Sequence, residues 1–416
     1  MHISLVGTNY QTAPLAIREK VAITTYKLDD YLELLHKYIP HGVILSTCNR
    51  TEVYTVDHAV RDTYDAVMRF FQESLNLNNS ILPLYQLENE QAVEHLYRVA
   101  AGLESMIVGE YEVLGQVKQA LRKAEKIGIV NLPLRYIFQS AIHTGRRVRR
   151  ETEISQNALS VSSLALEMAI KKVPDFNNCK LLVIGAGDAG RLVAKIALDR
   201  GIRQLTVAGR TMKRAKAITS KIGGKPVDLN NLPEELDNSK IIITCSGAPH
   251  RLLDFHRVAS IMKSRSENPL VIIDIGMPRN VDPDVSLIGN VYLYNIDDLI
   301  QLSETNRLKR EGEVIKAEEI ISDEMCKFSQ WQHNFEVRPL IKSIMNKGKI
   351  IRSYQLNRTL RKLPQLSDEE RDRLEAMTKT IVNKILEHPI HYLKNNNNNN
   401  NNHDIIKELF QLNKDD

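Results

Sequence analysis

Residues 46–52 are the part of the chain whose residue types most directly suggest chemistry. The sequence Ser-Thr-Cys-Asn-Arg-Thr-Glu places Cys48 in a polar turn between two strand-like segments, 43–45 and 53–56. A cysteine thiolate is a nucleophile, and a neighbouring cation lowers the pKa of a thiol. We expect Arg50 either to lower the pKa of the Cys48 thiol or to bind a carboxylate through its guanidinium group.

A lone cysteine is more often an inert, buried residue than a nucleophile. The neighbours of Cys48 favour the nucleophile, because Thr, Asn, Arg and Glu are poor packing partners for an inert core residue. The four cysteines are spaced too widely for a metal site or a disulfide framework; they are Cys48, Cys179, Cys245 and Cys326. We therefore expect no metal site and take Cys48 as the candidate nucleophile.

A second candidate site lies at residues 185–190. The apolar, strand-like segment 180–184 precedes it, and a helical pattern at 191–198 follows. In this setting glycines let the backbone approach a pyrophosphate, and the helix N-terminus stabilises its negative charge. The pattern predicts a dinucleotide site formed by Gly185, Ala186, Gly187, Asp188, Ala189 and Gly190.

The end of the next strand-like segment, 204–208, distinguishes between the two nicotinamide cofactors. NAD-binding sites place an acidic residue about twenty residues after the glycines, where it binds the ribose 2′-hydroxyl. Arg210 stands at that place here, and Lys213 and Arg214 follow it. Cations suit a 2′-phosphate, so the sequence favours NADPH over NADH. The alternative is that Arg210 is a surface residue and that an acidic residue comes from elsewhere in the fold.

The segment between the two candidate sites is mostly helical. A helix over 88–101 places His95 beside an apolar stripe, where a histidine is more often structural than catalytic. Residues 102–116 mix glycines, apolar residues and isolated polar residues, which suits a pocket wall. A helix over 133–150 ends in an arginine cluster at 146–150. This cluster would either contact a phosphate backbone or form a solvated helix end that offsets the helix dipole.

Length and composition set limits on these sites. The 416 residues suffice for two to three domains, and a hydrophobic content of 43% excludes global disorder. A net charge of +5 permits a polyanionic partner without requiring one. The N-terminus lacks the pattern of a secretory signal, and no apolar stretch is long enough to span a membrane. We therefore expect a cytoplasmic protein without membrane association, in which Cys48 stays reduced.

The surrounding elements indicate three kinds of structure. A strand at 3–6, helices at 14–22 and 28–39, and the strands flanking Cys48 are typical of a small α+β sandwich. Strands alternate with helices from 180 to 290, which is typical of a doubly wound parallel sheet.

From residue 296 onward, glycine and strand patterns nearly vanish. Apolar spacing predicts one helix over 297–335, roughly 58 Å long, which we expect to pack on another subunit. Helices at 340–361 and 368–387 follow. The asparagine run 395–402 is typical of a disordered linker.

Taken in this order, the parts resemble glutamyl-tRNA reductase, the family that opens the five-carbon route to porphyrins and other tetrapyrroles. Residues 46–52 are similar to its nucleophile motif, and residues 95–116 to its second signature. Arg149, Glu151, Thr152, the GAGxxG at 185–190 and residues 274–279 match further. The resemblance implies a multi-domain α/β fold: an α+β catalytic domain at 1–155, a Rossmann-type NADPH-binding domain at 156–292, an all-α dimerisation domain with a long spinal helix at 293–394, and a disordered linker and tail at 395–416.

The resemblance also implies roles for single residues. Cys48 would attack the ester carbonyl of glutamyl-tRNA and form a thioester, which NADPH would reduce to glutamate-1-semialdehyde. His95 would tune the thiol or place the carbonyl. The substrate-binding residues would be Thr47, Asn49, Arg50, Ser105, Glu110, Tyr111, Glu112 and Gln116. Tyr111 and Glu112 depart from the residues that the family often has there, so their side-chain roles are left open.

The resemblance further implies a homodimer with an open, V-shaped form. Whether the aldehyde passes through a transient complex to glutamate-1-semialdehyde aminomutase is left open. Two alternatives are an NADP-dependent dehydrogenase of the shikimate dehydrogenase kind, which needs no cysteine, and a non-catalytic tRNA-binding scaffold. The intact Cys48 motif and glycine loop favour the reductase.

Overall fold

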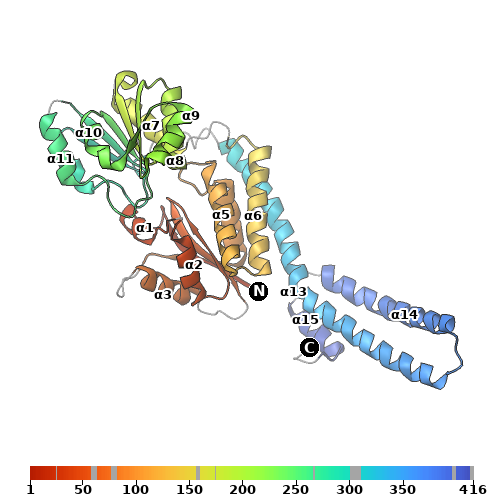
Figure 1. Ribbon diagram of the computed structural model, residues 1–416. Coiled ribbons are helices and arrows are strands. Elements are labelled where there is room, and N and C mark those ends of the chain that lie inside the picture. Colours follow the sequence, from red (N-terminus) through yellow and green to blue (C-terminus); the bar gives the residue numbers. More distant parts are fainter. Residues whose placement is uncertain are drawn as a thin grey trace. The chain divides into compact units, whose positions relative to one another are not determined.

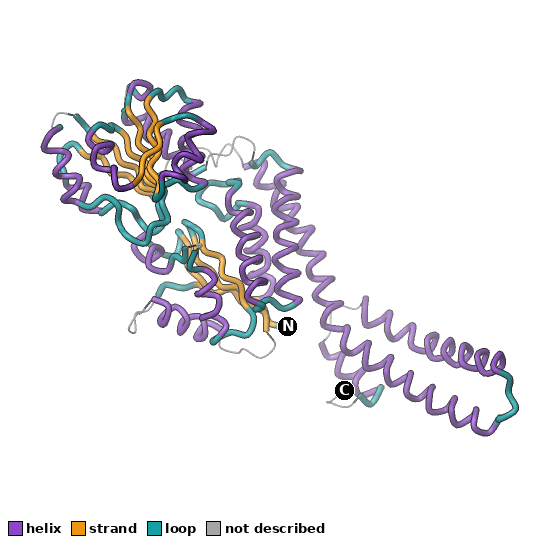
Figure 2. The backbone as a smooth tube through the Cα atoms, in the orientation of Figure 1, coloured by secondary structure: helices purple, strands orange, loops and turns teal. Residues whose placement is uncertain are grey.

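The computed structural model in Figure 1 describes residues 1–24, 26–57, 63–75, 82–155, 160–173, 175–265, 268–299, 311–395 and 400–412. The chain divides into two compact units, residues 1–322 and 323–416. Figure 2 shows that the strands form two separate sheets. Among the described residues, no helix is both long and apolar enough to cross a membrane.

The first sheet is antiparallel and has the strand order β2-β3-β1-β4. Its strands are β1 (His2–Asn9), β2 (Gly42–Ser46), β3 (Arg50–Asp57) and β4 (Tyr85–Glu88). Strands β1, β2 and β3 are buried at consecutive positions rather than at alternate ones. Because neighbouring residues of a strand face opposite sides, helices must cover both faces of this sheet.

Six helices provide that cover. They are α1 (Leu15–Val21), α2 (Leu28–His36), α3 (Thr63–Leu75), α4 (Asn89–Ala101), α5 (Glu112–Ile127) and α6 (Leu132–Glu151). Helices α4, α5 and α6 contact β1, β2 and β3, whereas α2 and α3 contact β2 and β1. The predicted α+β sandwich is confirmed, although its edge strand β4 was not predicted.

The second sheet has six parallel strands in the order β10-β9-β8-β5-β6-β7. Its elements are α7 (Val161–Lys172), β5 (Lys180–Ile184), α8 (Asp188–Asp199), β6 (Gln204–Gly209), α9 (Met212–Ile222), β7 (Lys225–Asp228), α10 (Leu232–Asp237), β8 (Ile241–Thr244), α11 (Phe255–Ser264), β9 (Leu270–Asp274) and β10 (Val291–Asn295). One apolar core joins the sheet to α7, α8 and α9, and a second joins its other face to α10 and α11.

This arrangement confirms the predicted doubly wound parallel sheet. The chain proceeds outward from β5 to β7 and then returns to β8 beside β5. Ligands of such sheets bind at this reversal, outside the carboxyl ends of the two central strands. The loops that follow β5 and β8 therefore form the expected cofactor crevice.

The long-helix prediction requires correction at both ends. Residues 296–299 form a turn, residues 300–310 lie outside the described part, and α13 extends over Glu311–Lys362. The helix was predicted to end at residue 335, but it continues past Pro339, which lies inside it. Val337 and Ile344 of α13 are fully buried in one apolar cluster, and this packing outweighs the local penalty of a proline.

The predicted disordered tail is wrong for residues 400–412. Helix α14 extends over Asp368–Asn395 and α15 over Asn400–Leu409, and residues 396–399 lie outside the described part. Ile406 joins the apolar cluster of α13 and α14, and Lys347 Nζ donates a hydrogen bond to the Phe410 carbonyl (2.7 Å). This short amphipathic helix was not predicted because it begins within the polar asparagine run.

Candidate active site

The turn between β2 and β3 presents Cys48. Ser46 and Thr51 form the last strand pair, and the Thr47 N–H donates to the Arg50 carbonyl (2.8 Å). The Thr47 hydroxyl oxygen accepts hydrogen bonds from the backbone N–H groups of Asn49 (3.0 Å) and Arg50 (3.2 Å). Thr47 therefore fixes the turn itself, and Cys48 stands half-buried at its tip.

The surroundings of Cys48 come from both sheets. The residue packs against a small apolar cluster that contains Leu15, Met106 and Ile296, and Met277 packs against the same cluster. Met277 belongs to the loop after β9, and Ile296 follows β10. The candidate nucleophile is therefore next to the carboxyl-end loops of the parallel sheet.

The predicted activation of Cys48 by Arg50 is not what the structure shows. Burial raises the pKa of the Cys48 thiol well above its usual range, and the Glu110 and Glu112 charges raise it further. The cation that opposes this shift is Arg18, whose Nη1 donates to the Cys48 carbonyl (3.2 Å). Arg18 is buried in α1 and also pairs with Asp297. The thiol is accordingly protonated at neutral pH in this conformation.

Arg50 is instead part of a buried network around Glu52. Its Nη1 donates to Glu52 Oε1 (2.8 Å), and its Nη2 donates to the Glu104 carbonyl. His95 Nε2 lies 3.1 Å from Glu52 Oε1 and 3.2 Å from Arg50 Nη1. His95 thus faces this ion pair, and its expected influence on the thiol remains a prediction.

Two tyrosines complete the network. The hydroxyl groups of Tyr54 and Tyr85 donate to the Glu52 carboxylate, each at 2.6 Å. Burial alone would raise the pKa of Glu52, but the charges of Arg50 and His95 reverse this, so the pKa lies well below its ordinary value. Glu52 is therefore an anion inside the sheet at neutral pH.

Strand register explains how these side chains meet. Gly7 of β1 pairs with Glu52 of β3 on one side and with Tyr85 of β4 on the other. A Cβ atom at Gly7 would stand only 2.9 Å from Glu52 Cγ. The missing side chain at Gly7 lets Glu52 and Tyr85 make contact across the middle strand.

Glu110 is the second buried carboxyl group near Cys48. Burial raises its pKa to about 7, although a hydrogen bond with the Ser105 side chain acts in the opposite direction. Both Ser105 and Glu110 are buried, and their place in a pocket wall remains a prediction. Tyr111, by contrast, is 61% exposed.

The raised pKa of Glu110 predicts a stability effect of definite sign. The folded state holds this proton more tightly than the unfolded state, so its stabilising contribution is complete below pH 4.5 and is lost as the pH rises through about 7. We expect Glu110→Gln to remove a decline of about 3 kcal/mol in unfolding free energy over that interval. Calorimetric unfolding from pH 4.5 to 8 measures it.

Glu94→Gln is a matched control, since Glu94 is an exposed glutamate on α4. Its stability curve should run parallel to that of the unchanged protein. A Glu110→Gln curve that also ran parallel would contradict the assignment.

The arginines of the cluster at 146–150 make different contacts. Arg149 donates from Nη1 to the carbonyls of Ala100 (2.7 Å) and Gly145 (2.8 Å), and from Nη2 to the carbonyl of Glu110 (2.9 Å). Burial lowers the pKa of Arg149 to about 10. Arg149 therefore joins the helices to the Glu110 segment. Arg147 and Arg150 each pair with Glu151.

The glycine loop has the form that a dinucleotide requires. A Cβ at Gly185 would stand 2.8 Å from the Cys245 backbone, and one at Gly190 would stand 1.8 Å from the Gly185 carbonyl oxygen. A Cβ at Gly187 would face open space. The first and third glycines thus permit the tight turn and the close helix packing, and the second leaves room for a pyrophosphate at the N-terminus of α8.

The end of β6 carries the predicted cations. Arg210, Lys213 and Arg214 are all exposed there, and Thr211 caps α9 by accepting a hydrogen bond from the Arg214 N–H. Ala186 lies in the turn after β5, and Asp188 and Ala189 begin α8. The residues present therefore fit a nicotinamide dinucleotide.

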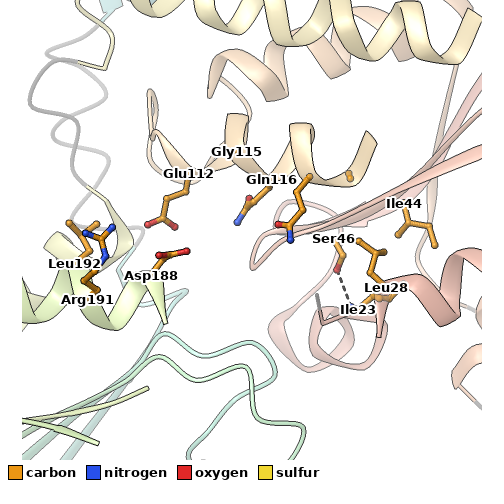
Figure 3. A pocket seen from close by; sticks show the side chains of 12 residues that line it. Ile23, Leu28, Ile44, Ser46, Glu112, Gly115, Gln116, Asp188, Arg191 and Leu192 are labelled. Atoms are coloured by element: carbon orange, nitrogen blue, oxygen red, sulfur yellow. Dashed lines mark hydrogen bonds between the residues drawn. The ribbon is translucent and has the colours of Figure 1, made fainter. Parts of the chain in front are cut away.

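A cavity of about 620 Å³ lies between the two sheets of the larger unit. Figure 3 shows Glu112 and Asp188 pointing toward one another at one side and Ile23, Leu28 and Ile44 at the other. Its lining residues are Ile23, Leu28, Ile44, Ser46, Glu112, Gly115, Gln116, Gln119, Ala120, Asp188, Arg191 and Leu192. Of the predicted site residues, the cavity thus brings together Glu112, Gln116 and Asp188.

Several residues of the site were not predicted. Arg18 and Asp297 are far apart in sequence, and the sequence offers no signal that they meet. Glu52 was predicted only as part of the polar motif, although its place directly before the strand-like segment 53–56 was a signal of a buried carboxylate. Glu19 of α1 also forms a bidentate ion pair with Arg279, whose Nη2 and Nε donate to the carboxylate oxygens of Glu19 at 2.6 and 2.7 Å.

A nucleotide-binding parallel sheet and an adjacent domain with a cysteine turn define a nicotinamide-dependent oxidoreductase. Three family matches follow the chain in order: residues 6–152 match the glutamyl-tRNAGlu reductase N-terminal domain, residues 167–302 match shikimate/quinate 5-dehydrogenase, and residues 316–412 match the glutamyl-tRNAGlu reductase dimerisation domain.

Whole-length relatives agree with these matches. The glutamyl-tRNA reductase of Natranaerobius thermophilus is 36% identical over 400 residues, covering 95% of this chain and 87% of that protein. That of Bacillus pumilus is 34% identical over 423 residues, covering 100% and 93%. The solved structure of the enzyme from Methanopyrus kandleri has a TM-score of 0.51 at 30% identity and covers 99% of each chain. The chain belongs to the glutamyl-tRNA reductase family.

Proposed function

We propose that this protein reduces glutamyl-tRNA to glutamate-1-semialdehyde with NADPH, through a thioester on Cys48, in the first step of tetrapyrrole synthesis. One observation carries the proposal: Cys48 packs in the same cluster as Met277, from the loop after β9. A nucleophile held there faces the crevice in which a dinucleotide binds such a sheet.

The chemistry accounts for both halves of the site. The Cys48 sulfur attacks the ester carbonyl, the C–O bond to the tRNA ribose breaks, and the ribose oxygen leaves with the thiol proton. The thioester that forms accepts hydride more readily than the ester it replaces. NADPH, when bound, supplies this hydride. The resulting hemithioacetal anion collapses to the aldehyde and the Cys48 thiolate, and the sulfur then takes up a proton from water.

Asn49 is the best placed residue for the glutamyl group. Its Oδ1 is buried and has no hydrogen-bond partner within the described part of the chain. A buried acceptor without a partner is costly, so a ligand donor is expected there. The glutamyl ammonium group is such a donor. Glu110, which is hydrogen-bonded to Ser105, is near the same turn, because its charge raises the pKa of the Cys48 thiol.

Arg50 can bind the substrate only while it also stays paired with Glu52. Because its guanidinium is already paired with Glu52, a substrate carboxylate would share it rather than neutralise it. His95 adjoins the same pair, and we assign both residues to placing the glutamyl side chain. Gln116 lines the adjoining cavity.

Cofactor preference provides a direct prediction. Arg210→Asp replaces the candidate partner of the 2′-phosphate with a like charge, so we expect KM for NADPH to rise about ten- to a hundredfold while KM for NADH stays nearly constant. Steady-state kinetics with both cofactors measures this.

Arg203→Asp is the matched control, because Arg203 is exposed just before the start of the same strand, β6. It should leave both KM values unchanged. Equal losses for NADPH and NADH in Arg210→Asp would contradict the 2′-phosphate assignment.

The assembly is part of the same proposal. Residues 316–412 match a dimerisation domain, and we infer a homodimer formed through α13 and α14. We also infer a cytoplasmic location, where Cys48 remains a thiol. A transient complex with glutamate-1-semialdehyde aminomutase would protect the reactive aldehyde, and we keep it as part of the proposal.

One assay tests the function as a whole. The purified protein is incubated with glutamyl-tRNA and NADPH, and the semialdehyde and NADPH oxidation are both measured. Aldehyde formation that requires both substrates supports the proposal. NADPH oxidation with a free hydroxy acid would indicate an ordinary dehydrogenase, and tRNA binding without oxidation would indicate a scaffold.

A further inference from the structure

The cavity shown in Figure 3 has two chemically different sides. Glu112 and Asp188 face each other at one side, and burial together with the Asp188 charge raises the pKa of Glu112. The other side is an apolar wall formed by Ile23, Leu28 and Ile44. Arg191 also lines the cavity, and the two carboxylates accept hydrogen bonds from hydroxyl groups.

The cavity meets the dinucleotide path at one end, at the start of α8. Its lining residues from the parallel-sheet domain all come from α8, namely Asp188, Arg191 and Leu192. The buried face of α8, which packs on the sheet, is formed by other residues, such as Gly190 and Val193. A dinucleotide follows the strand ends and the first turn of this helix, which includes Asp188 and Arg191. The other lining residues belong to the domain of the first sheet, so the rest of the cavity has room for a different ligand.

Gly115 is a second sign of a ligand. It lies within α5 and lines the cavity, and a Cβ atom there would face open space. A glycine in a helix interior costs about 1 kcal/mol relative to alanine. No packing contact among the described residues requires the smaller residue, so its remaining use is to let a ligand approach the helix backbone closely.

The cavity adjoins the candidate nucleophile. Ser46 lines its wall two residues before Cys48, and the Glu112 charge acts on the Cys48 thiol. If the glutamyl carbonyl is at the Cys48 sulfur, the group joined to it through the ester oxygen must lie close by. In an aminoacyl-tRNA that group is the ribose of the 3′-terminal adenosine.

We propose that this cavity is the subsite for the 3′-terminal adenosine of the acyl-tRNA, an inference that rests on the proposed function. Glu112 accepts the hydrogen bond of the free ribose hydroxyl, and the apolar wall contacts one face of the adenine. Gln119, which lines the cavity from α5, presents an amide that can pair with the edge of adenine. The volume of about 620 Å³ is in the range of pockets that hold a small molecule.

Two experiments test this subsite. The first measures inhibition by short RNAs, and the second fills the cavity with a larger side chain. The trinucleotide CCA should inhibit competitively against glutamyl-tRNA, and CCC should inhibit about tenfold more weakly. Gly115→Leu places a side chain in the open space, so we expect KM for glutamyl-tRNA to rise at least about tenfold and the preference for CCA to disappear. KM for NADPH should stay unchanged.

Gly312→Leu is the control, because Gly312 is also a helical glycine whose Cβ would face open space, in α13. It should leave every constant unchanged. Gln119→Ala is the second variant and should weaken CCA more than CCC. The inference is overturned if CCA and CCC inhibit the unchanged protein equally, or if Gly115→Leu raises KM for NADPH instead. Absence of aldehyde from the unchanged protein would refute the proposed function, a separate outcome.

Discussion

Cys48→Ser should abolish formation of the semialdehyde while leaving the fold intact. A serine hydroxyl is a poorer nucleophile than a thiol, and an ester formed on it would be no easier to reduce than the substrate ester. We therefore expect kcat to fall by at least about a thousandfold. The reaction is followed as NADPH oxidation with purified glutamyl-tRNA. Trapping labelled glutamate on the protein without NADPH gives a second measurement, and the label should be absent from the variant.

Two features of the site make this test specific. Cys48 is half-buried at a turn held by backbone hydrogen bonds to Thr47, so the replacement of sulfur by oxygen changes little of the packing. Cys326 is an exposed cysteine of α13, and Cys326→Ser is the matched control. Its activity should equal that of the unchanged protein. Retention of most reductase activity by Cys48→Ser would remove the basis of the proposed mechanism.

Features set by local sequence could be predicted well. The turn at Cys48 lies between two short, apolar segments, and both form strands as predicted. The glycines at 185–190 have strong steric requirements of their own, since a side chain at Gly190 would collide with the Gly185 carbonyl. Such features depend on residues that are adjacent in the chain, so the sequence pattern contains nearly all of the information.

Features set by distant contacts could not be predicted in this way. Arg18 reaches the Cys48 carbonyl and Asp297 because two domains fold against α1, and the sequence gives no distance between these residues. The direction of the Cys48 pKa shift depends on burial and on Glu110 and Glu112, which outweigh one cation.

Short edge strands and a proline within a helix were missed for a related reason. Strands β4, β7 and β10 are edge strands. Each is too short to show a clear alternation of apolar and polar residues in the sequence. The helix was predicted to end before Pro339, at residue 335, and local propensity disfavours a proline inside a helix. The apolar contacts of the surrounding helix decide the outcome there, and they are visible only in three dimensions.

Glu52→Gln should destabilise the first sheet strongly. Glu52 is fully buried and accepts hydrogen bonds from Arg50, Tyr54 and Tyr85. The amide removes the charge that offsets the buried guanidinium of Arg50. Breaking one partner of a buried ion pair costs about 3–5 kcal/mol. The midpoint of thermal unfolding should fall on the order of 10 °C, which scanning calorimetry at pH 7 measures.

The pH dependence and a matched pair make the Glu52 prediction specific. Since the pKa of Glu52 lies below its ordinary 4.5, the stabilisation is present above that pH and is lost as the pH falls toward the folded-state value, so the two proteins should converge in acid. Glu125→Gln breaks a half-exposed pair with Arg135 (2.8 Å) and should change the unfolding free energy by less than about 1 kcal/mol. Equal effects of the two substitutions at neutral pH would show that the buried network around Glu52 does not stabilise the sheet.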